Sequence, residues 1–119
     1  MFKVIVAGSR TFNNYSLMKR KLDNIFSNID GEIEIVSGTA AGADTLGERY
    51  AAEHGLLIKR MPADWEQYKG SAGYRRNEEM AKYVAPDGAC VVFWNGSRGT
   101  GHMIDLAVKY KLKLRIIRF

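Results

Sequence analysis

Short apolar segments that stop at a glycine alternate along this chain with segments whose apolar residues recur every three or four positions. The first, Phe2–Ala7, is rich in β-branched residues and precedes Gly8, as is typical of a buried strand leading into a tight turn. The longest apolar run, Ala89–Trp94, is typical of a central strand in a parallel sheet. Strands that alternate with helices need crossover connections, which make the strands parallel and place helices on both faces of the sheet.

Five segments are predicted to be strands and four to be helices. The strands are Phe2–Ala7, Glu32–Ser37, Leu56–Met61, Ala89–Trp94 and Leu112–Ile117. The helical stripes lie in Met18–Ile29, Ala43–His54, Arg76–Val84 and Thr100–Val108, and residues 62–73 are predicted to be irregular. The sequence therefore predicts the α/β class: one Rossmann-like, doubly wound domain over residues 1–119, with a mainly parallel five-stranded sheet and helices on both faces.

Composition narrows the class of protein. With 46% hydrophobic and 26% charged residues, the chain has the composition of a folded soluble protein, and no apolar run approaches the roughly 18 to 20 residues that span a bilayer. No signal peptide is predicted, and Cys90 is the only cysteine, so we expect a cytoplasmic protein without disulfides. His54 and His102 lack ligand spacing with Cys90, and neither a metal site nor another cofactor is predicted.

The net charge of +5 is concentrated at the C-terminal end of the sequence. The last eleven residues contain no acid and five bases: Lys109, Lys111, Lys113, Arg115 and Arg118. Three of these bases alternate with apolar residues, which is typical of an edge strand with one solvated face. The same charges could attract a nucleic acid or another phosphate-bearing partner, so both interpretations stay open.

Glycine and hydroxyl residues follow three of the predicted strands. In a doubly wound sheet, ligands bind outside the carboxyl ends of the strands, where helix N-termini direct free N–H groups at an anion. Glycine lets the backbone approach a phosphate closely, and hydroxyls donate hydrogen bonds to its oxygens. The predicted binding residues in these loops are Gly8, Ser9, Arg10, Gly38, Thr39, Gly42, Gly96, Ser97, Arg98, Gly99 and Thr100. Neither a P-loop nor a complete Gly-x-Gly-x-x-Gly motif is present, so ATP hydrolysis and NAD-dependent hydride transfer have little support.

Arginine and tryptophan side chains are predicted to complete an anion site at these loops. Arg76 and Arg98 are favoured because each is expected at a helix start, where a planar guanidinium could bind a phosphate in a bidentate manner. Asn77, next to Arg76, belongs to the same predicted set. Trp65 lies in a segment otherwise suited to solvent, where its ring either stacks on a base or packs against the core.

Two aspartates are candidates for acid–base chemistry. Asp44 is expected in the first turn of a helix, where its carboxylate either complements the helix dipole or contacts the ligand. Asp105 is expected one turn into the fourth helix, near the third loop, where it could act as a general acid or base. No serine lies in a Gly-x-Ser-x-Gly elbow, and Cys90 is expected to be a buried, inert thiol.

Four motifs resemble the YspA/cpYpsA-related branch of the SLOG superfamily, which is common in bacteria and phages. They are residues 37–44 (SGTAAGAD), 62–65 (PADW), 72–77 (AGYRRN) and 93–100 (FWNGSRGT). The superfamily also includes the LOG phosphoribohydrolases and the DNA-processing proteins of the DprA/Smf type. The resemblance extends over essentially the whole chain and implies a Rossmann-like domain that binds or senses a nucleotide or nucleotide-derived ligand.

The similarity to the LOG enzymes implies a first alternative, N-glycosidic hydrolysis of a nucleotide. Arg76 matches their catalytic arginine, but Met103 stands where they carry a catalytic glutamate. A thioether neither stabilises positive charge on a ribose nor activates water, so Asp105 or Asp44 would have to act instead. Whether the protein is an enzyme therefore stays open.

The DprA/Smf resemblance implies a second alternative, which is binding of single-stranded DNA. The LOG resemblance implies a homodimer, for which Leu112–Phe119 could offer an edge.

Overall fold

Five parallel strands form the centre of the molecule in the computed structural model, which describes residues 1–119. Their order across the sheet is β3–β2–β1–β4–β5, and every neighbouring pair is parallel. The strands are β1 (Phe2–Gly8), β2 (Ile33–Ser37), β3 (Leu57–Arg60), β4 (Ala89–Trp94) and β5 (Lys113–Arg118). The predicted Rossmann-like α/β architecture is confirmed, and each predicted strand is found within one residue at either end.

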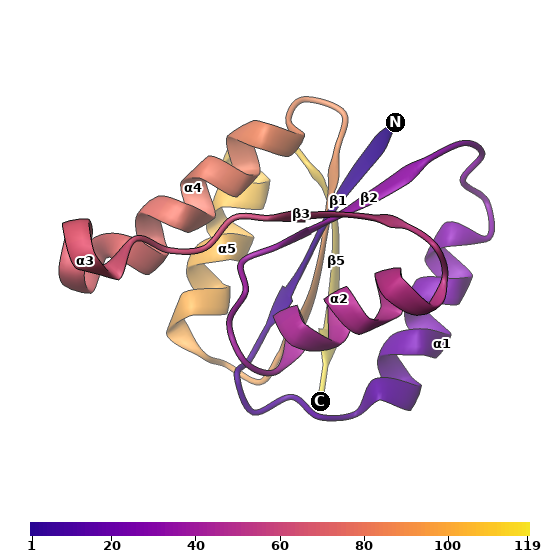
Figure 1. The fold of residues 1–119 in the computed structure, drawn as a ribbon, viewed down its shortest axis with the longest axis horizontal. Helices are drawn as coiled ribbons and strands as arrows, with labels where there is room; N and C mark the ends of the chain where they lie inside the picture. Colours follow the sequence, from indigo (N-terminus) through magenta and orange to yellow (C-terminus); the bar gives the residue numbers. More distant parts are fainter.

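Helices cover both faces of the sheet (Figure 1). On one face lie α1 (Tyr15–Phe26) and α2 (Ala43–Glu53), and on the other lie α4 (Ala72–Val84) and α5 (Arg98–Lys109). Successive residues of a strand point to opposite faces, so Val4 and Val6 pack with α1 and α2, whereas Ile5 and Ala7 pack with α4 and α5. The sheet thus separates two hydrophobic cores.

The strand order reverses at β1, because β2 and β3 lie on one side of it and β4 and β5 on the other. Such a reversal leaves a crevice at the carboxyl ends of the two central strands, here β1 and β4. Gly8 ends β1 at this crevice. A Cβ on Gly8 would lie 2.8 Å from the Cβ of Ala43 and closer still to the carbonyl oxygen of Phe93, so only glycine lets the end of β1 lie against both α2 and β4.

Residues 62–73, predicted to be irregular, contain two short helical segments. Helix α3 (Trp65–Tyr68) begins after Asp64, whose carboxylate accepts a hydrogen bond from the N–H of Gln67 (3.0 Å), and a 3-10 turn (Lys69–Ser71) leads into α4. The prediction that Arg76 begins a helix is therefore wrong, because α4 starts one turn earlier. The helix predicted to reach Ile29 also ends sooner, at Phe26.

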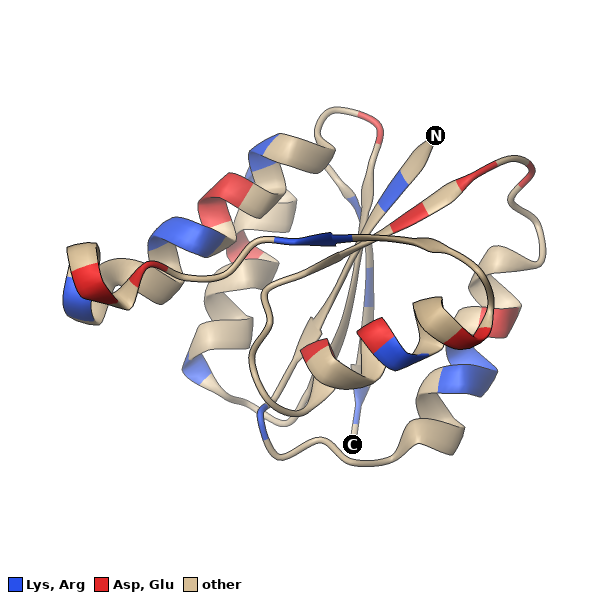
Figure 2. Cartoon of the chain, viewed as in Figure 1, with Lys and Arg blue, Asp and Glu red and all other residues tan.

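The two edge strands of the sheet carry Lys and Arg residues (Figure 2). β5 lies at one edge, as its alternating pattern predicted, and its bases are exposed. The other edge is β3, where Lys59 and Arg60 are also exposed. No helix is long and apolar enough to cross a membrane.

Candidate functional site

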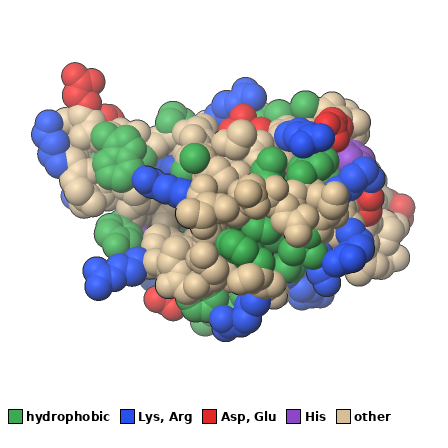
Figure 3. Space-filling view, turned by 90° about the horizontal axis from the view of Figure 1, so that it is seen from below, with side chains coloured by type: hydrophobic (Ala, Val, Ile, Leu, Met, Phe, Trp, Pro, Cys, Tyr) green, Lys and Arg blue, Asp and Glu red, His purple; other side chains and the backbone are tan.

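A cavity of about 510 Å³ lies at the carboxyl ends of β1 and β4, where the strand order reverses. Its size is within the usual range of small-molecule sites. The loops after β1, β2 and β4 supply its walls together with α4, and α3 brings an aromatic ring to it. Figure 3 looks onto this edge from below and shows the molecule notched between the lobe that carries α3 and the rest of the body.

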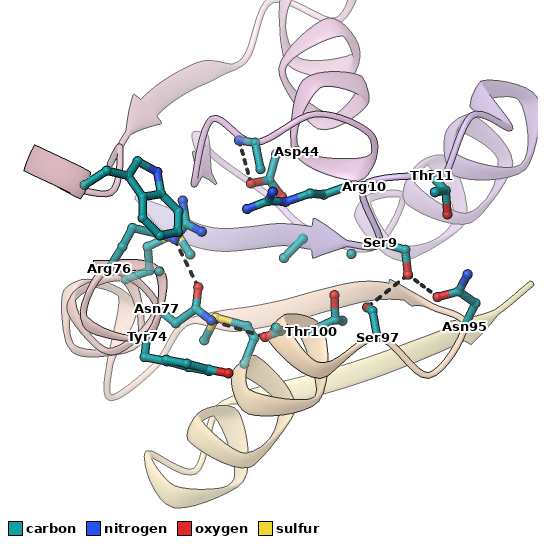
Figure 4. Close-up of a pocket in the computed structure, with 18 of the residues that line it drawn as sticks. Ser9, Arg10, Thr11, Asp44, Tyr74, Arg76, Asn77, Asn95, Ser97 and Thr100 are labelled. Carbon is teal, nitrogen blue, oxygen red and sulfur yellow. Dashed lines mark hydrogen bonds between the residues drawn. The ribbon is translucent and has the colours of Figure 1, made fainter. Parts of the chain in front are cut away.

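Three polar side chains meet where the β1 loop contacts the loop before α5. The hydroxyl of Ser9, a buried residue, donates a hydrogen bond to Oδ1 of Asn95 (2.5 Å) and lies 3.2 Å from the hydroxyl oxygen of Ser97 (Figure 4). Ser97 is the N-cap residue of α5, but its side chain makes no capping hydrogen bond. The first turn of α5 therefore keeps free N–H groups at this end of the cavity, which is an arrangement that binds anions.

Thr100 lies in the same first turn and lines the cavity. The residue is only 5% exposed, and its hydroxyl forms no hydrogen bond with the rest of the protein. Since no fully buried polar side-chain atom lacks a partner, this hydroxyl must be open to the cavity. A ligand at the start of α5 would therefore meet an unpaired hydroxyl as well as the helix N–H groups.

Asp44 and Arg76 meet over Gly38 at the other end of the cavity. Asp44 lies in the first turn of α2, is 5% exposed, and accepts a hydrogen bond from the N–H of Ala40 (3.1 Å). Arg76 donates from Nη1 to the carbonyl oxygen of Gly38 and from Nε to Asn77 (3.1 Å). A Cβ on Gly38 would lie 2.6 Å from Nη1 of Arg76 and 2.9 Å from Oδ2 of Asp44, so this approach requires glycine.

Burial dominates the electrostatics of this pair. It raises the pKa of Asp44 to about 6, although the N–H of Ala40 and the guanidinium groups of Arg76 and Arg10 oppose the shift. Burial also lowers the pKa of Arg76, with the like charge of Arg10 acting in the same direction and Asp44 opposing it. The carboxyl of Asp44 can therefore gain or lose a proton close to neutral pH.

Asn77 connects the two ends of the cavity. Its side-chain N–H donates to the carbonyl oxygen of Gly99 (3.2 Å) and lies 3.2 Å from Nδ1 of His102, while its amide oxygen accepts from Arg76. The amide is thus engaged within the protein and positions Arg76 relative to α5. His102 is half-buried and packs edge-on against Tyr74, with 4.6 Å between ring centroids.

Two aromatic side chains form the outer rim of the cavity. Trp65 is 50% exposed and Tyr74 47% exposed, and both line the cavity. Trp65 is therefore not part of the hydrophobic core, although the edge of its ring lies near Gly73 of α4, and half of the residue is open to the solvent and the cavity. Tyr68, in the same short helix as Trp65, is half-buried under Arg75, whose Cζ lies 4.3 Å from the ring centroid.

Two predicted site residues, Arg98 and Asp105, do not line the cavity. Arg98 does begin α5, as predicted, but both side chains are exposed. A helix turns by about 100° per residue, which places both residues roughly opposite the face that carries Thr100 and Met103. The lining residues Thr100 and Met103 are both buried on the cavity side of α5.

The remaining predicted loop residues divide into three groups. Gly8, Ser9, Arg10, Ser97 and Gly99 line the cavity. Gly38 and Thr39 line a neighbouring hollow instead, and Gly42 and Gly96 line neither. Gly42 is the N-cap residue of α2 with φ of +81°, and Gly96 has φ of +100° in the β4–α5 loop, so these two glycines shape the backbone.

Asn95, Tyr74 and Glu48 have roles that the sequence analysis missed. Asn95 follows β4 directly, and the pairing of β1 with β4 brings it to Ser9. Tyr74 is three residues before Asn77, a spacing that shares a helix face. Glu48 supports the second loop by accepting hydrogen bonds from Ser37 (2.6 Å) and Arg60 (2.7 Å).

Cys90 lies in the middle of β4 and is fully buried. Burial raises the pKa of its thiol to about 12, so the thiolate is not accessible at neutral pH, as the sequence predicted. No group of three or more His, Cys, Asp or Glu side chains lies close enough together to hold a metal ion.

An all-parallel sheet of order β3–β2–β1–β4–β5, with a cavity at its switch point, defines a doubly wound Rossmann-like protein. Comparison with known proteins then identifies the family. The chain belongs to the YspA, cpYpsA-related SLOG family, whose sequence model matches residues 2–68. It is 30% identical over 115 residues to the Gene 61 protein of Mycobacterium phage D29, an alignment that covers 92% of this chain and 90% of that protein. No solved structure matches the chain.

The matched residues contain the first two loops and Trp65. Arg76, Asn77 and the start of α5 lie outside them, so more than half of the residues that line the cavity come from the part of the chain that the family model does not match. The resemblance inferred from the four sequence motifs is confirmed by the family match.

Proposed function

We propose that the protein binds a nucleotide or nucleotide-derived ligand in this cavity, with a phosphate at the start of α5 and a base at the aromatic rim. One observation carries the proposal: an uncapped helix N-terminus, an unpaired hydroxyl and two half-exposed aromatic rings all border the same cavity. Membership of a SLOG family supports it, because the resemblance implies nucleotide-related ligands.

The start of α5 suits a phosphate for three reasons. Its N–H groups are free, its dipole favours negative charge, and Thr100 and Ser97 add hydroxyls. A negative charge at a helix N-terminus gains about 0.3–1 kcal/mol when exposed and up to about 2 kcal/mol when partly buried. Arg10, which also lines the cavity, adds a long cationic side chain that can approach an anion.

The opposite end suits a ribose and a base. Stacking on an indole contributes about 1–3 kcal/mol per base in nucleic-acid complexes, and Trp65 offers such a ring. Asp44 and Arg76 supply an acceptor and a donor that could hydrogen-bond to ribose hydroxyls or to the edge of a base.

Isothermal titration calorimetry with the four ribonucleoside 5′-monophosphates tests the proposal. Thr100→Val keeps the shape of the side chain and should weaken binding about five- to tenfold, since one hydrogen bond contributes about 1 kcal/mol. Trp65→Ala should weaken it by about 1–3 kcal/mol, or roughly 5- to 150-fold. Arg98→Gln, outside the cavity, is the matched control and should change the affinity less than about twofold. No binding at millimolar nucleotide, or equal losses in all three variants, would contradict the proposal.

A second candidate function, N-glycosidic hydrolysis, is favoured by the buried carboxyl of Asp44 beside Arg76. In this reaction the carboxylate takes a proton from water, the water oxygen bonds to C1′ of the ribose, and the C–N bond breaks with its electron pair going to the base. The proton held by Asp44 then passes to the departing base, which restores the carboxylate, and ribose 5-phosphate is the other product. A pKa of about 6 is close to the value that suits a general base at neutral pH.

Release of free base, measured by chromatography after incubation with nucleoside monophosphates, distinguishes the two candidates. If Asp44 is the base, Asp44→Asn should lower the rate of release by about 10²–10⁴-fold while nucleotide binding persists. Binding by the wild-type protein without any release of base would exclude hydrolysis of the tested nucleotides and leave the binding function in place.

A further inference from the structure

A second hollow of about 430 Å³ lies beside the cavity, outside the carboxyl ends of β2 and β3. Residues 38–41, which follow β2, and Pro62 and Ala63, which follow β3, line it. Arg10, Ala40, Trp65 and Arg76 line both the cavity and this hollow. The two spaces therefore adjoin, with the shared side chains at their boundary.

The boundary carries more positive than negative charge. Arg10 is exposed and forms no ion pair with a carboxylate. Arg76 uses Nε and Nη1 within the protein, but its Nη2 has no hydrogen-bond partner. Asp44 is the acid that lines the cavity, and its carboxyl lies beside the Arg10 side chain (Figure 4). Two guanidinium groups thus face one carboxyl, and the excess of positive charge attracts an anion.

A mononucleotide would leave the second hollow empty. With its phosphate at the start of α5, it has no second anionic group to place between Arg10 and Arg76. The size of that hollow is again within the range of small-molecule sites. Trp65 borders both spaces, so one ring could contact groups on either side.

We propose that the ligand consists of two nucleotide-sized halves joined through a phosphoryl linkage, one half in the cavity, the linkage between Arg10 and Arg76, and the other half in the second hollow. This inference rests on the proposed function, since it extends the same site. The shared chemistry is an anionic linkage between two nucleosides, which a phosphodiester and a pyrophosphate both provide.

Calorimetry with three adenosine compounds tests the inference. AMP fills the cavity alone, and 5′-phosphorylated diadenylate (pApA) adds a second half through a phosphodiester while keeping a phosphate for the start of α5. Diadenosine diphosphate joins two halves through a pyrophosphate and has no further phosphate for α5. At least one two-part compound should bind ten or more times more tightly than AMP. Tighter binding of one of the two compounds shows whether the site takes a phosphodiester or a pyrophosphate.

Ala41 provides a variant confined to the second hollow, because it is exposed and does not line the cavity. Ala41→Glu places bulk and negative charge in that hollow and should bring the two-part compound to within about twofold of AMP, while AMP itself binds as before. Ala41→Ser is the matched control and should preserve the preference. Thermal unfolding curves check that both variants are folded.

The outcomes separate the two proposals. If AMP binds and neither two-part compound binds more tightly, or if Ala41→Glu leaves the preference unchanged, the two-part ligand is wrong and nucleotide binding stands. If none of the three compounds binds, the two-part ligand is overturned together with the adenine-nucleotide form of the proposed function.

Discussion

Replacement of Asp44 by asparagine should stabilise the protein by an amount that depends on pH. The carboxyl of Asp44 is buried at the start of α2, and this burial raises its pKa from 3.8 to about 6. Asparagine has almost the same size and keeps an oxygen for the N–H of Ala40, but it carries no ionisable group. The variant therefore removes the cost of ionising a buried carboxyl and little else.

Proton linkage gives the sign and the size of the effect. Below about pH 4 the carboxyl is protonated in the folded and unfolded states alike, so it does not lower the stability of the wild type. Between about pH 4 and 6 the unfolded chain loses the proton while the folded protein keeps it, so the wild type becomes less stable as the pH rises. A shift of about two pKa units at 1.36 kcal/mol each gives about 3 kcal/mol, which is large beside a typical total stability of about 5–15 kcal/mol.

Urea unfolding followed by tryptophan fluorescence at several pH values from 4 to 8 measures this difference. Relative to the wild type, Asp44→Asn should gain stability between pH 4 and about 6 and then hold a constant advantage of up to about 3 kcal/mol. Asp105→Asn, which removes an exposed carboxylate of α5, is the control and should stay within about 0.5 kcal/mol throughout. If the advantage of Asp44→Asn were flat across this range or fell with rising pH, ion pairing with Arg76 and Arg10 would outweigh burial and the reasoning would be refuted.

Three further predictions concern the same site and the basic edge. Gly38→Ala should destabilise the protein by about 1–3 kcal/mol in urea unfolding, because the methyl group would lie within 3 Å of Arg76 and Asp44. Gly73→Ala is the control and should not destabilise the protein in this way, because the nearest atom to its methyl group would be 3.5 Å away. Equal losses of stability in the two variants would contradict the packing argument. The wild type should lose affinity for AMP relative to Asp44→Asn as the pH rises through about 6, because an ionised carboxylate repels the ligand. Calorimetry at pH 5 and 8 measures both affinities, and a ratio of the two that does not change with pH would contradict this prediction. Fluorescence anisotropy measures the affinity for single-stranded oligonucleotides at several salt concentrations. The slope of log K against log salt should be shallower than about −2, the value for three phosphate contacts. A steeper slope that flattens in Arg115→Gln would instead place nucleic acid on β5.

The strands could be predicted from the sequence because a buried strand is marked by its own apolar residues. Ala89–Trp94 is found with its predicted bounds, since a strand covered on both faces must be apolar at every position. The short helix α3 left a weaker signal, a capping pattern from Asp64 to Gln67, among glycines that suggested a loop. A single helical turn contributes few apolar residues, so periodicity could not reveal it.

The direction of the side chains on α5 could have been predicted but was not. The buried positions Thr100, Met103, Leu106 and Ala107 define the inner face of the helix, and the same periodicity places Arg98 and Asp105 outside it. Proximity to a glycine-rich loop in the sequence was therefore a poor guide to contact with the cavity. The meeting of Arg76 with Gly38, 38 residues apart, depends on how α4 packs beside β2, and no local pattern encodes that distance.

The two glycine-rich helix starts that look equivalent in the sequence differ in their capacity for an anion. At α2 the N–H of Ala43 donates to the carbonyl oxygen of Ser9 (3.3 Å), and the carboxyl of Asp44 occupies the first turn, where it also binds the N–H of Ala40. A phosphate there would compete with a carboxyl for the same donors and would lie beside it. At α5 no side chain caps the helix, the first turn contains no acid, and the hydroxyl of Thr100 has no hydrogen-bond partner in the protein. Phosphate is therefore favoured at α5, and in the proposed complex the sugar and base of the nucleotide lie toward Asp44, Arg76 and Trp65.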